Sequence, residues 1–277
     1  MSESFSIRKY LRELPLPFCP GCGGLTVMSE FLRATYELGH ENLSKFVFCS
    51  GIGCSSWIPS PHFMADSVHT LHGRSIPVAT GIKLLRPDLN VVVFGGDGDI
   101  VGIGLSHFIH AARRNVDILV IMVNNMVYGM TGGQVAPTTP LKAKTTTTPY
   151  GSFEYPLDAA KLAVTAGACY VARWTTAHPK ELKESIKNAI ELKGFRFIEA
   201  VSQCPTAFGR RVGFKGAGEM LKWFKENTIQ ISQTEGLSEE NLMEKIIVGN
   251  FIRRQRATLI ETVYSTIEEA KKEIEEN

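Results

Sequence analysis

One pair of cysteines near the start of the chain has the spacing of metal ligands. Cys19 and Cys22 form a Cys-x-x-Cys knuckle in which Gly21 and Gly23 are interleaved with the thiols. Two thiolates three positions apart can grip one centre, and the glycines let backbone N–H groups face the sulfurs. Such a knuckle alone leaves zinc, an iron-sulfur cluster and a redox dithiol open, and two more thiolates would complete a tetrahedral set.

Cys54 and Cys204 are the candidates for the remaining two thiolates. Cys54 lies just past the first strand that the sequence predicts, and Cys204 lies just past the last. The carboxyl ends of parallel strands share one edge of a sheet, so we expect both thiols at that edge. Cys49 and Cys169 fall inside or beside predicted strands, and we expect them to be buried as small hydrophobic side chains.

A second chemical pattern combines a glycine-rich turn with a pair of amides. Gly96-Asp97-Gly98 follows an apolar strand, and Asn124-Asn125 ends the next strand along the chain. Glycines let a backbone approach an anion closely, a helix start offers N–H groups, and carboxylate and amide oxygens suit a hard cation. The two patterns together predict a diphosphate and Mg²⁺ site, whereas either alone is equally typical of a capped helix or a tight turn.

The elements that must position these residues alternate between strand and helix. Strands are predicted at residues 45–49, 90–94, 118–123, 169–173 and 196–201. Helical periodicity falls at residues 24–38, 73–85, 102–113, 156–166 and 179–192. This alternation predicts an α/β fold with an open, doubly wound, mostly parallel sheet, which binds ligands beyond the carboxyl ends of its strands.

The chain divides by composition into a main domain and a tail. We expect a domain over residues 1–210 and a charged helical extension over residues 211–277, which is packed on the domain or faces a partner and ends in an acidic helix at 265–277. The Thr- and Pro-rich segment 131–155 is too long for an ordinary connection, so we expect a functional loop or a packed excursion.

Composition excludes several classes of function. The 277 residues carry 30 basic and 28 acidic side chains, a net charge of +2 that offers no footprint for nucleic acid. No apolar stretch approaches the roughly 20 residues that a membrane span needs, and residues 1–5 lack a secretory pattern. We therefore expect a cytoplasmic protein, in which clustered cysteines bind metal or do redox chemistry.

The combination of Gly96-Asp97-Gly98 with Asn124-Asn125 resembles the thiamine-diphosphate motif. The resemblance implies a thiamine-diphosphate-binding fold in which Asp97, Asn125 and the main-chain oxygen of Val127 bind Mg²⁺. The residues expected to bind the cofactor or shape its site are Gly53, Gly96, Asp97, Gly98, Asp99, Asn124, Asn125, Val127 and Thr131.

Together with the cysteines, this motif makes the chain resemble the β subunits of the 2-oxoacid:ferredoxin oxidoreductases, from about Leu14 to Gly209. The resemblance implies one [4Fe-4S] cluster, held by Cys19, Cys22, Cys54 and Cys204. Zinc is the chemical alternative for four thiolates, but it would leave the neighbouring cofactor without an electron acceptor.

That family oxidatively decarboxylates a 2-oxoacid with coenzyme A, giving an acyl-CoA and carbon dioxide. Electrons pass from thiamine diphosphate through the cluster to ferredoxin. The resemblance implies a partner, an α or fused α/γ subunit, which binds the aminopyrimidine and most of the coenzyme A, and it allows a small ferredoxin-like subunit. No second doubly wound domain fits after residue 210, so we expect the chain alone to be inactive.

The segment from His72 to Arg74 resembles stretches in the branch of the family that acts on 2-oxoglutarate and other non-pyruvate acids. This resemblance favours 2-oxoglutarate, with succinyl-CoA as the product, over pyruvate or a branched-chain 2-oxoacid. We expect Arg74 to attract a substrate carboxylate and His72 to hydrogen-bond near the reacting carbon. Trp57 stands where the resemblance implies a smaller or basic residue. Two other functions stay open: a non-oxidative thiamine-diphosphate decarboxylase subunit, and a scaffold subunit without chemistry.

Overall fold

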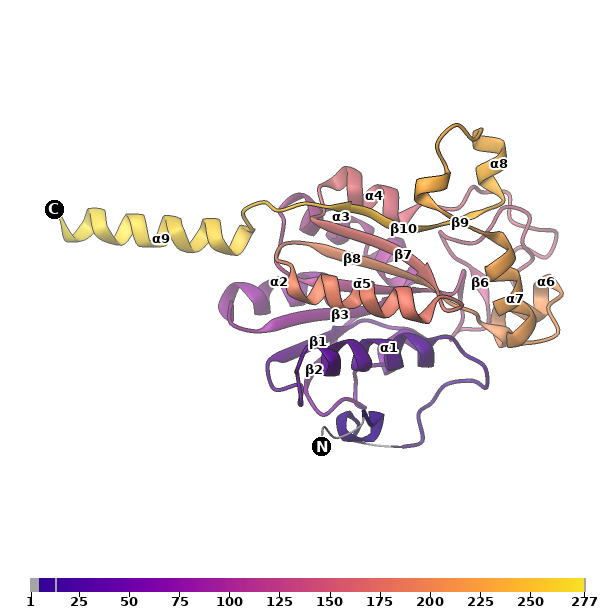
Figure 1. Ribbon diagram of the computed structural model, residues 1–277, viewed down its shortest axis with the longest axis horizontal. Helices are drawn as coiled ribbons and strands as arrows, with labels where there is room; N and C mark the ends of the chain where they lie inside the picture. Colours follow the sequence, from indigo (N-terminus) through magenta and orange to yellow (C-terminus); the bar gives the residue numbers. More distant parts are fainter. Residues whose placement is uncertain (1–4, 13, 277) are drawn as a thin grey trace.

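The computed structural model describes residues 5–12 and 14–276. Residues 1–4, which carry most of the segment that we expect to lack a secretory pattern, lie outside the described residues. So does Asn277, at the end of the predicted acidic helix. The centre of the molecule is an eight-stranded sheet with the order β2-β1-β3-β4-β8-β7-β10-β9. Figure 1 shows this sheet between two layers of helices, which confirms the predicted doubly wound architecture.

Five strands of the sheet match the predicted ones to within two residues at either end. They are β1 (Phe46–Ser50), β3 (Asn90–Gly96), β4 (Leu119–Asn124), β7 (Tyr170–Thr175) and β8 (Arg196–Val201). All neighbouring pairs among them run parallel. The apolar runs of β3 and β4 are buried on both faces, as expected where helices cover a parallel sheet on each side.

Two helices cover one face of the sheet, α1 (Gly24–Glu37) and α5 (Pro179–Glu191). The other face carries α2 (Ser75–Leu85), α3 (Leu105–Arg113) and α4 (Ala159–Ala166). Successive strand residues face opposite layers, so Val92 and Phe94 join the core under α1 and α5 while Val91 and Val93 join the other. The expected helix at 156–166 begins later, because Asp158 caps it by accepting a hydrogen bond from the Lys161 N–H.

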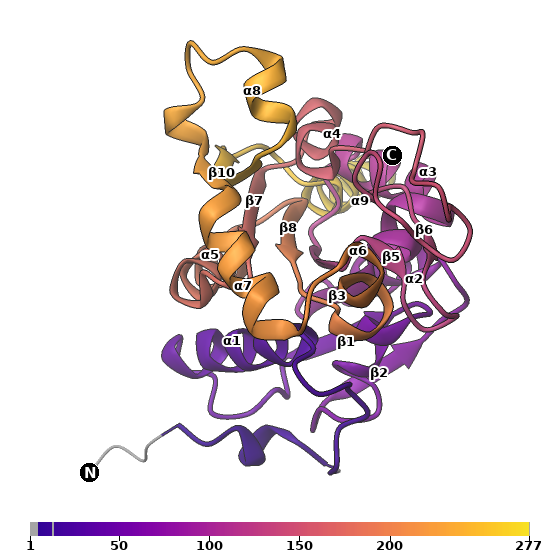
Figure 2. The same ribbon diagram turned by 90° about the vertical axis from the view of Figure 1, so that its right-hand side faces the viewer.

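Short elements gather at the carboxyl ends of the central strands. They are η2 (Cys54–Trp57), η3 (Gly98–Ile103), β5 (Val127–Tyr128), β6 (Gln134–Val135), η4 (Pro205–Gly209), α6 (Arg210–Val212) and α7 (Ala217–Asn227). Figure 2 looks onto this end and shows β5, α6 and α7 over the strand tips. The sequence segments singled out for chemistry therefore converge at one edge of the sheet.

The segment after residue 210 contains the expected helices and also two strands that the sequence analysis did not predict. β10 (Ile246–Arg253) pairs antiparallel with β7, and β9 (Thr228–Gln230) pairs with β10 at the edge of the sheet. Between them lie η5 (Ile231–Gln233) and α8 (Glu239–Met243). Part of this segment is thus built into the main sheet, which the expectation of a helical extension did not include.

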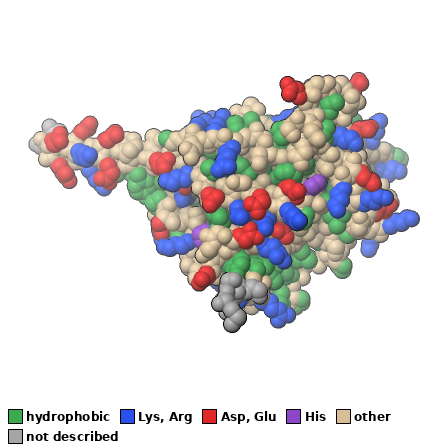
Figure 3. Space-filling model, viewed as in Figure 1, with side chains coloured by type: hydrophobic (Ala, Val, Ile, Leu, Met, Phe, Trp, Pro, Cys, Tyr) green, Lys and Arg blue, Asp and Glu red, His purple; other side chains and the backbone are tan. Residues whose placement is uncertain are grey.

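The last helix, α9 (Leu259–Glu275), projects from the body of the molecule (Figure 1). Figure 3 shows acidic and basic side chains along it. Its start is anchored because Ile260 is buried in the core under α2, α3 and α4 and Tyr264 Oη donates to the Leu84 carbonyl at 3.0 Å. At the edge of the sheet opposite β9 are η1 (Ile7–Tyr10) and β2 (Asp66–His69), and β2 pairs with β1.

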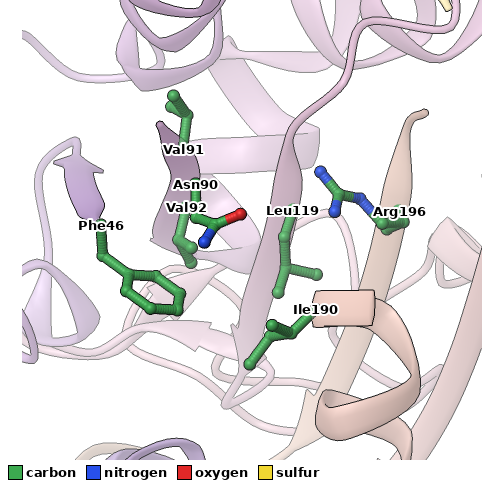
Figure 4. A pocket seen from close by; sticks show the side chains of 7 residues that line it. All are labelled: Phe46, Asn90, Val91, Val92, Leu119, Ile190 and Arg196. Carbon is green, nitrogen blue, oxygen red and sulfur yellow. The ribbon is translucent and has the colours of Figure 1, made fainter. Parts of the chain in front are cut away.

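A small cavity lies at the amino ends of the strands, at the other end of the sheet from the short elements described above. Figure 4 shows its lining, which includes Phe46, Asn90 and Arg196, the first residues of β1, β3 and β8. Its volume of about 10 Å³ leaves room for roughly one water molecule. This cavity is therefore too small for a cofactor.

Candidate active site

A cavity of about 100 Å³ opens at the carboxyl ends of β1, β3 and β4. Eight of the nine residues expected at the cofactor line it, the exception being Asn124. Cys54, a predicted cluster ligand, and His72, a predicted substrate contact, line it as well. The residues in its wall are Ile52, Gly53, Cys54, Ser55, His72, Gly96, Asp97, Gly98, Asp99, Asn125, Val127, Tyr128, Gly129, Met130 and Thr131.

Asp97 supplies a buried carboxylate to this cavity. The residue is 2% exposed and follows β3 directly. Burial raises the pKa of Asp97 to about 7, against the hydrogen bonds from Thr138 and the backbone, which lower it. Thr138 Oγ1 donates to one carboxylate oxygen. A desolvated carboxylate of this kind fits a divalent cation, because the cation would offset the cost of burying the negative charge.

Glycine is required directly after Asp97. A β-carbon at Gly98 would lie 2.1 Å from the Tyr128 ring, so any larger residue would displace that ring. The Gly98 carbonyl also accepts a hydrogen bond from Tyr128 Oη at 3.5 Å. On the far side of the cavity, Gly53 has a φ of 132° and nothing within 4 Å of its would-be β-carbon. The wall is therefore open at Gly53 and tightly packed at Gly98.

Asn125 and Val127 lie in the turn that follows β4. Asn125 Oδ1 accepts a hydrogen bond from the Val127 N–H at 3.3 Å, and both residues line the cavity. Thr131 lies at its rim, where its hydroxyl donates to Gln134 Oε1 at 2.7 Å. The structure thus brings the three expected Mg²⁺ ligands, Asp97, Asn125 and Val127, to one cavity.

Asn124 points away from the cavity. Its Nδ2 donates to Glu199 Oε1 at 2.8 Å, and its Oδ1 accepts from the Met126 N–H at 3.1 Å. Met126 adopts a positive φ of 68°, so the Asn124 side chain stabilises a tight turn. Glu199 is in turn paired with Arg173 Nε at 2.7 Å. The structure gives Asn124 this supporting place rather than one at the cavity wall.

His72 and Asp99 form a close pair at the mouth of the cavity. His72 Nδ1 lies 2.5 Å from Asp99 Oδ1, and the same oxygen accepts from the N–H groups of Ile52 and Gly73. Arg74 is exposed; its guanidinium donates to the carbonyls of Gly73 and Ile103, at 3.2 and 3.5 Å. Arg74 does not line the cavity, so its contact with a substrate stays a prediction.

The four cysteines expected to bind a cluster surround the same edge of the sheet. Burial raises the pKa of the Cys22 thiol, and Cys204 and Cys19 add to this rise. Burial, together with the other three thiols, raises the pKa of Cys54 to about 11. Thiols whose pKa is raised by burial and by neighbouring thiols fit a cationic centre, which would deprotonate them. Cys19 is exposed, whereas Cys204 is half-buried.

The other two cysteines are fully buried, as predicted. Cys49 lies in β1, and burial raises the pKa of its thiol to about 12. Cys169 donates from its thiol to Asn115 Oδ1 at 3.0 Å. Trp57, the residue that departs from the resemblance, is 37% exposed, with its ring centroid 6.3 Å from that of His62.

Sequence reasoning missed several residues that shape the cavity. Tyr128 packs on Gly98, and Thr138 binds the Asp97 carboxylate from the long loop after β6. The same loop returns to the site through Thr139, whose hydroxyl donates to the Met126 carbonyl at 2.6 Å. The expected packed excursion is therefore observed, but no spacing in its Thr-rich sequence marks which threonine reaches the carboxylate.

Comparison with known proteins agrees with this geometry. Residues 51–200 match the family described as thiamine pyrophosphate enzyme, C-terminal TPP-binding domain. A 2-oxoglutarate synthase subunit KorB of Methanocaldococcus jannaschii is 52% identical over 96% of this chain and 98% of its own length. The corresponding subunit of Methanothermobacter marburgensis is 48% identical over 96% of this chain and 94% of its own length.

A solved structure matches over nearly the whole fold. It is the 2-oxoglutarate:ferredoxin oxidoreductase from Magnetococcus marinus with 2-oxoglutarate, coenzyme A and succinyl-CoA bound. The TM-score is 0.86 and the identity 35%, over 97% of this chain and 92% of the other. The chain belongs to the β subunits of the 2-oxoacid:ferredoxin oxidoreductases. The resemblance drawn from the two motifs is thereby confirmed, as are the oxidoreductase class and thiamine diphosphate as the cofactor.

The metal ligands of this family member stay predictions. Within residues 5–12 and 14–276, no three His, Cys, Asp or Glu side chains form a group that could hold a metal ion. Over the same residues, no helix has the length and apolar character of a membrane span.

Proposed function

We propose that the chain is the β subunit of a 2-oxoglutarate:ferredoxin oxidoreductase, which makes succinyl-CoA and carbon dioxide. The observation that carries the proposal is the cavity, which Asp97 and Asn125 line together with Cys54 and His72. The names of the relatives and of the solved structure support 2-oxoglutarate over pyruvate or a branched-chain acid. Arg74, at the start of α2, is the positive charge of this chain closest in sequence to the cavity wall.

Asp97, Asn125 and the Val127 carbonyl would hold Mg²⁺, and the diphosphate would lie against the Gly96–Gly98 turn. The buried Asp97 carboxylate supports this assignment because it has a single side-chain donor, Thr138, among the described residues. Thiamine diphosphate, when bound, supplies the carbanion chemistry, and the protein supplies position and electrostatics. Tyr128 and Gly98 keep the turn rigid, since the ring leaves no space for another side chain.

Cys19, Cys22, Cys54 and Cys204 would hold one [4Fe-4S] cluster next to this cavity. Cys54 supports the proposal in two ways, because it lines the cavity and its thiol interacts with those of the other three cysteines. A cluster at this place would give electrons a short exit toward ferredoxin. All six cysteines are free thiols, which is typical of a reducing compartment and supports a cytoplasmic location.

An α or fused α/γ subunit would complete the active site. This chain contributes one doubly wound sheet, and the residues after 210 form β9, β10 and helices rather than a second such domain. The aminopyrimidine and most of coenzyme A would then contact the partner, and a small ferredoxin-like subunit would be compatible with this arrangement. We expect no turnover from the isolated chain.

The proposal is tested by assaying the assembled complex against 2-oxoglutarate, pyruvate and branched-chain 2-oxoacids, with coenzyme A and ferredoxin. We expect 2-oxoglutarate to give the highest kcat/KM, and the purified complex to be brown, with about four irons per β chain from this cluster after any iron in partner subunits is subtracted. A preference for pyruvate would refute the substrate assignment. A colourless protein that decarboxylates without ferredoxin would favour the non-oxidative alternative, and the absence of thiamine-diphosphate binding would favour a scaffold subunit.

A further inference from the structure

The contacts of Asp99 differ from those expected of a cofactor ligand. The residue is 1% exposed, and its Oδ1 accepts hydrogen bonds from the N–H groups of Ile52 at 3.1 Å and Gly73 at 2.7 Å. These two donors belong to different loops, which follow β1 and β2. Asp99 therefore links the two loops that contain Ile52 and Gly73.

The same oxygen fixes the orientation of the His72 ring. Its Nδ1 lies 2.5 Å from Asp99 Oδ1, which already accepts from two backbone donors and so acts as an acceptor here as well. Nδ1 must therefore carry a proton, and in the charged ring Nε2–H is the second donor, the one that can engage a ligand. His72 lines the cavity, and its side chain is 35% exposed.

Packing prevents the Asp99 carboxyl group from turning. A β-carbon at Gly51 would lie 2.2 Å from Asp99 Oδ2, and one at Gly95 would lie 3.0 Å from it. Oδ2 is buried and has no hydrogen-bond partner among the described residues. The carboxylate is thus held by the backbone on one side and by its two N–H donors on the other, which is the rigid support that an oriented side chain needs.

We propose that Asp99 is a positioning residue that holds the charged ring of His72 so that Nε2–H donates a hydrogen bond to an oxygen atom of the bound 2-oxoacid. This inference rests on the proposed function, because it assumes that the substrate occupies the cavity next to His72. It removes Asp99 from the set of direct cofactor contacts and assigns His72 its orientation. Tyr128 flanks the imidazole edge-on, with ring centroids 6.2 Å apart, and limits tilting of the ring.

The test is a double-mutant cycle on the assembled complex, with Asp99→Asn, His72→Ala and the double variant. Asp99→Asn keeps an oxygen for the two backbone donors but removes the negative charge that favours the charged ring of His72. We therefore expect it to lower kcat/KM for the 2-oxoacid by about 10–100-fold, mainly through kcat, with thiamine-diphosphate affinity and iron content unchanged. Because Asp99 acts through His72, the double variant should be no slower than His72→Ala. The matched control is His110→Asn on the exposed face of α3, which should leave kcat and KM unchanged.

A second pair of variants tests the inference even if Asp99→Asn does not assemble. In His72→Asn the amide nitrogen takes the place of Nδ1 and keeps the bond to Asp99, but nothing replaces Nε2. We expect it to keep the melting temperature of the wild type and to lose as much activity as His72→Ala, which should melt lower. Any one of three results would overturn the inference. The effects of the two single variants could multiply in the double variant, His72→Asn could keep full activity, or the wild type, His72→Asn and His72→Ala could melt at the same temperature. A wild-type complex that turns over no 2-oxoacid would instead refute the proposed function.

Discussion

Arg173 is the charged side chain whose loss should cost the most stability. It is 8% exposed; its Nε lies 2.7 Å from Glu199 Oε2, and Nη2 contacts Asp158. Arg173→Met keeps an apolar stem in the site and leaves the Glu199 carboxylate buried without a counter-charge. Removing one partner of a buried pair costs about 3–5 kcal/mol. The side chain of Asp158 is 32% exposed, so water can replace that half of the interaction, and we expect about 3 kcal/mol.

Urea denaturation of the chain, followed by circular dichroism, measures this loss as a shift of the midpoint at constant m-value. The double variant Arg173→Met/Glu199→Gln should be more stable than Arg173→Met, because no unpaired charge remains. Lys193→Met is the control: it breaks the exposed pair with Glu261 and should cost less than about 1 kcal/mol. A loss below 1 kcal/mol for Arg173→Met, or a double variant no more stable than the single one, would refute the reasoning.

Three further predictions concern the cofactor and pH. Asp97→Ala should abolish Mg²⁺-dependent binding of thiamine diphosphate to the complex, measured by calorimetry, and leave the iron content unchanged; loss of both would mean that Asp97 acts through folding. Gly98→Ala should weaken cofactor binding at least 10-fold, because its β-carbon would lie 2.1 Å from the Tyr128 ring, whereas Gly218→Ala, with open space around it, should not. Burial raises the pKa of Asp158, but the charge of Arg173 and neighbouring hydrogen bonds lower it by more than burial raises it. The net pKa of Asp158 therefore lies below its ordinary value. The stabilisation that the ionised Asp158 gains from Arg173 is present above about pH 4 and is lost as pH falls through the lowered pKa. The difference in unfolding free energy between wild type and Arg173→Met should therefore narrow in acid.

The sequence was sufficient for β3 and β4 because each is a run of apolar residues that ends at a turn. β3 and β4 are buried on both faces and bounded by Gly96 and Asn124, so their positions and the convergence of their ends could be predicted. β10 was missed because Gly249 and a register shift between Asn250 and Ile252 interrupt its apolar pattern. β2 was missed because it is a short edge strand, largely exposed, with no run of apolar residues.

The same limit applies to the site, where spacing predicts which loop a residue joins but not where its side chain points. Asn124 and Asn125 are adjacent in the motif, yet Asn124 is the last residue of β4 and turns into the sheet toward Glu199, whereas Asn125 faces the cavity. Asp97 and Asp99 differ in the same way, because Asp97 reaches Thr138 while Asp99 turns under the loops of Ile52 and Gly73. These contacts of Asn124, Asp97 and Asp99 join residues 26 to 75 positions apart along the chain, so only the fold brings them together. At each of the two strand ends, one residue that we propose to bind the cofactor or its Mg²⁺ thus lies beside one that holds the surrounding turns in place.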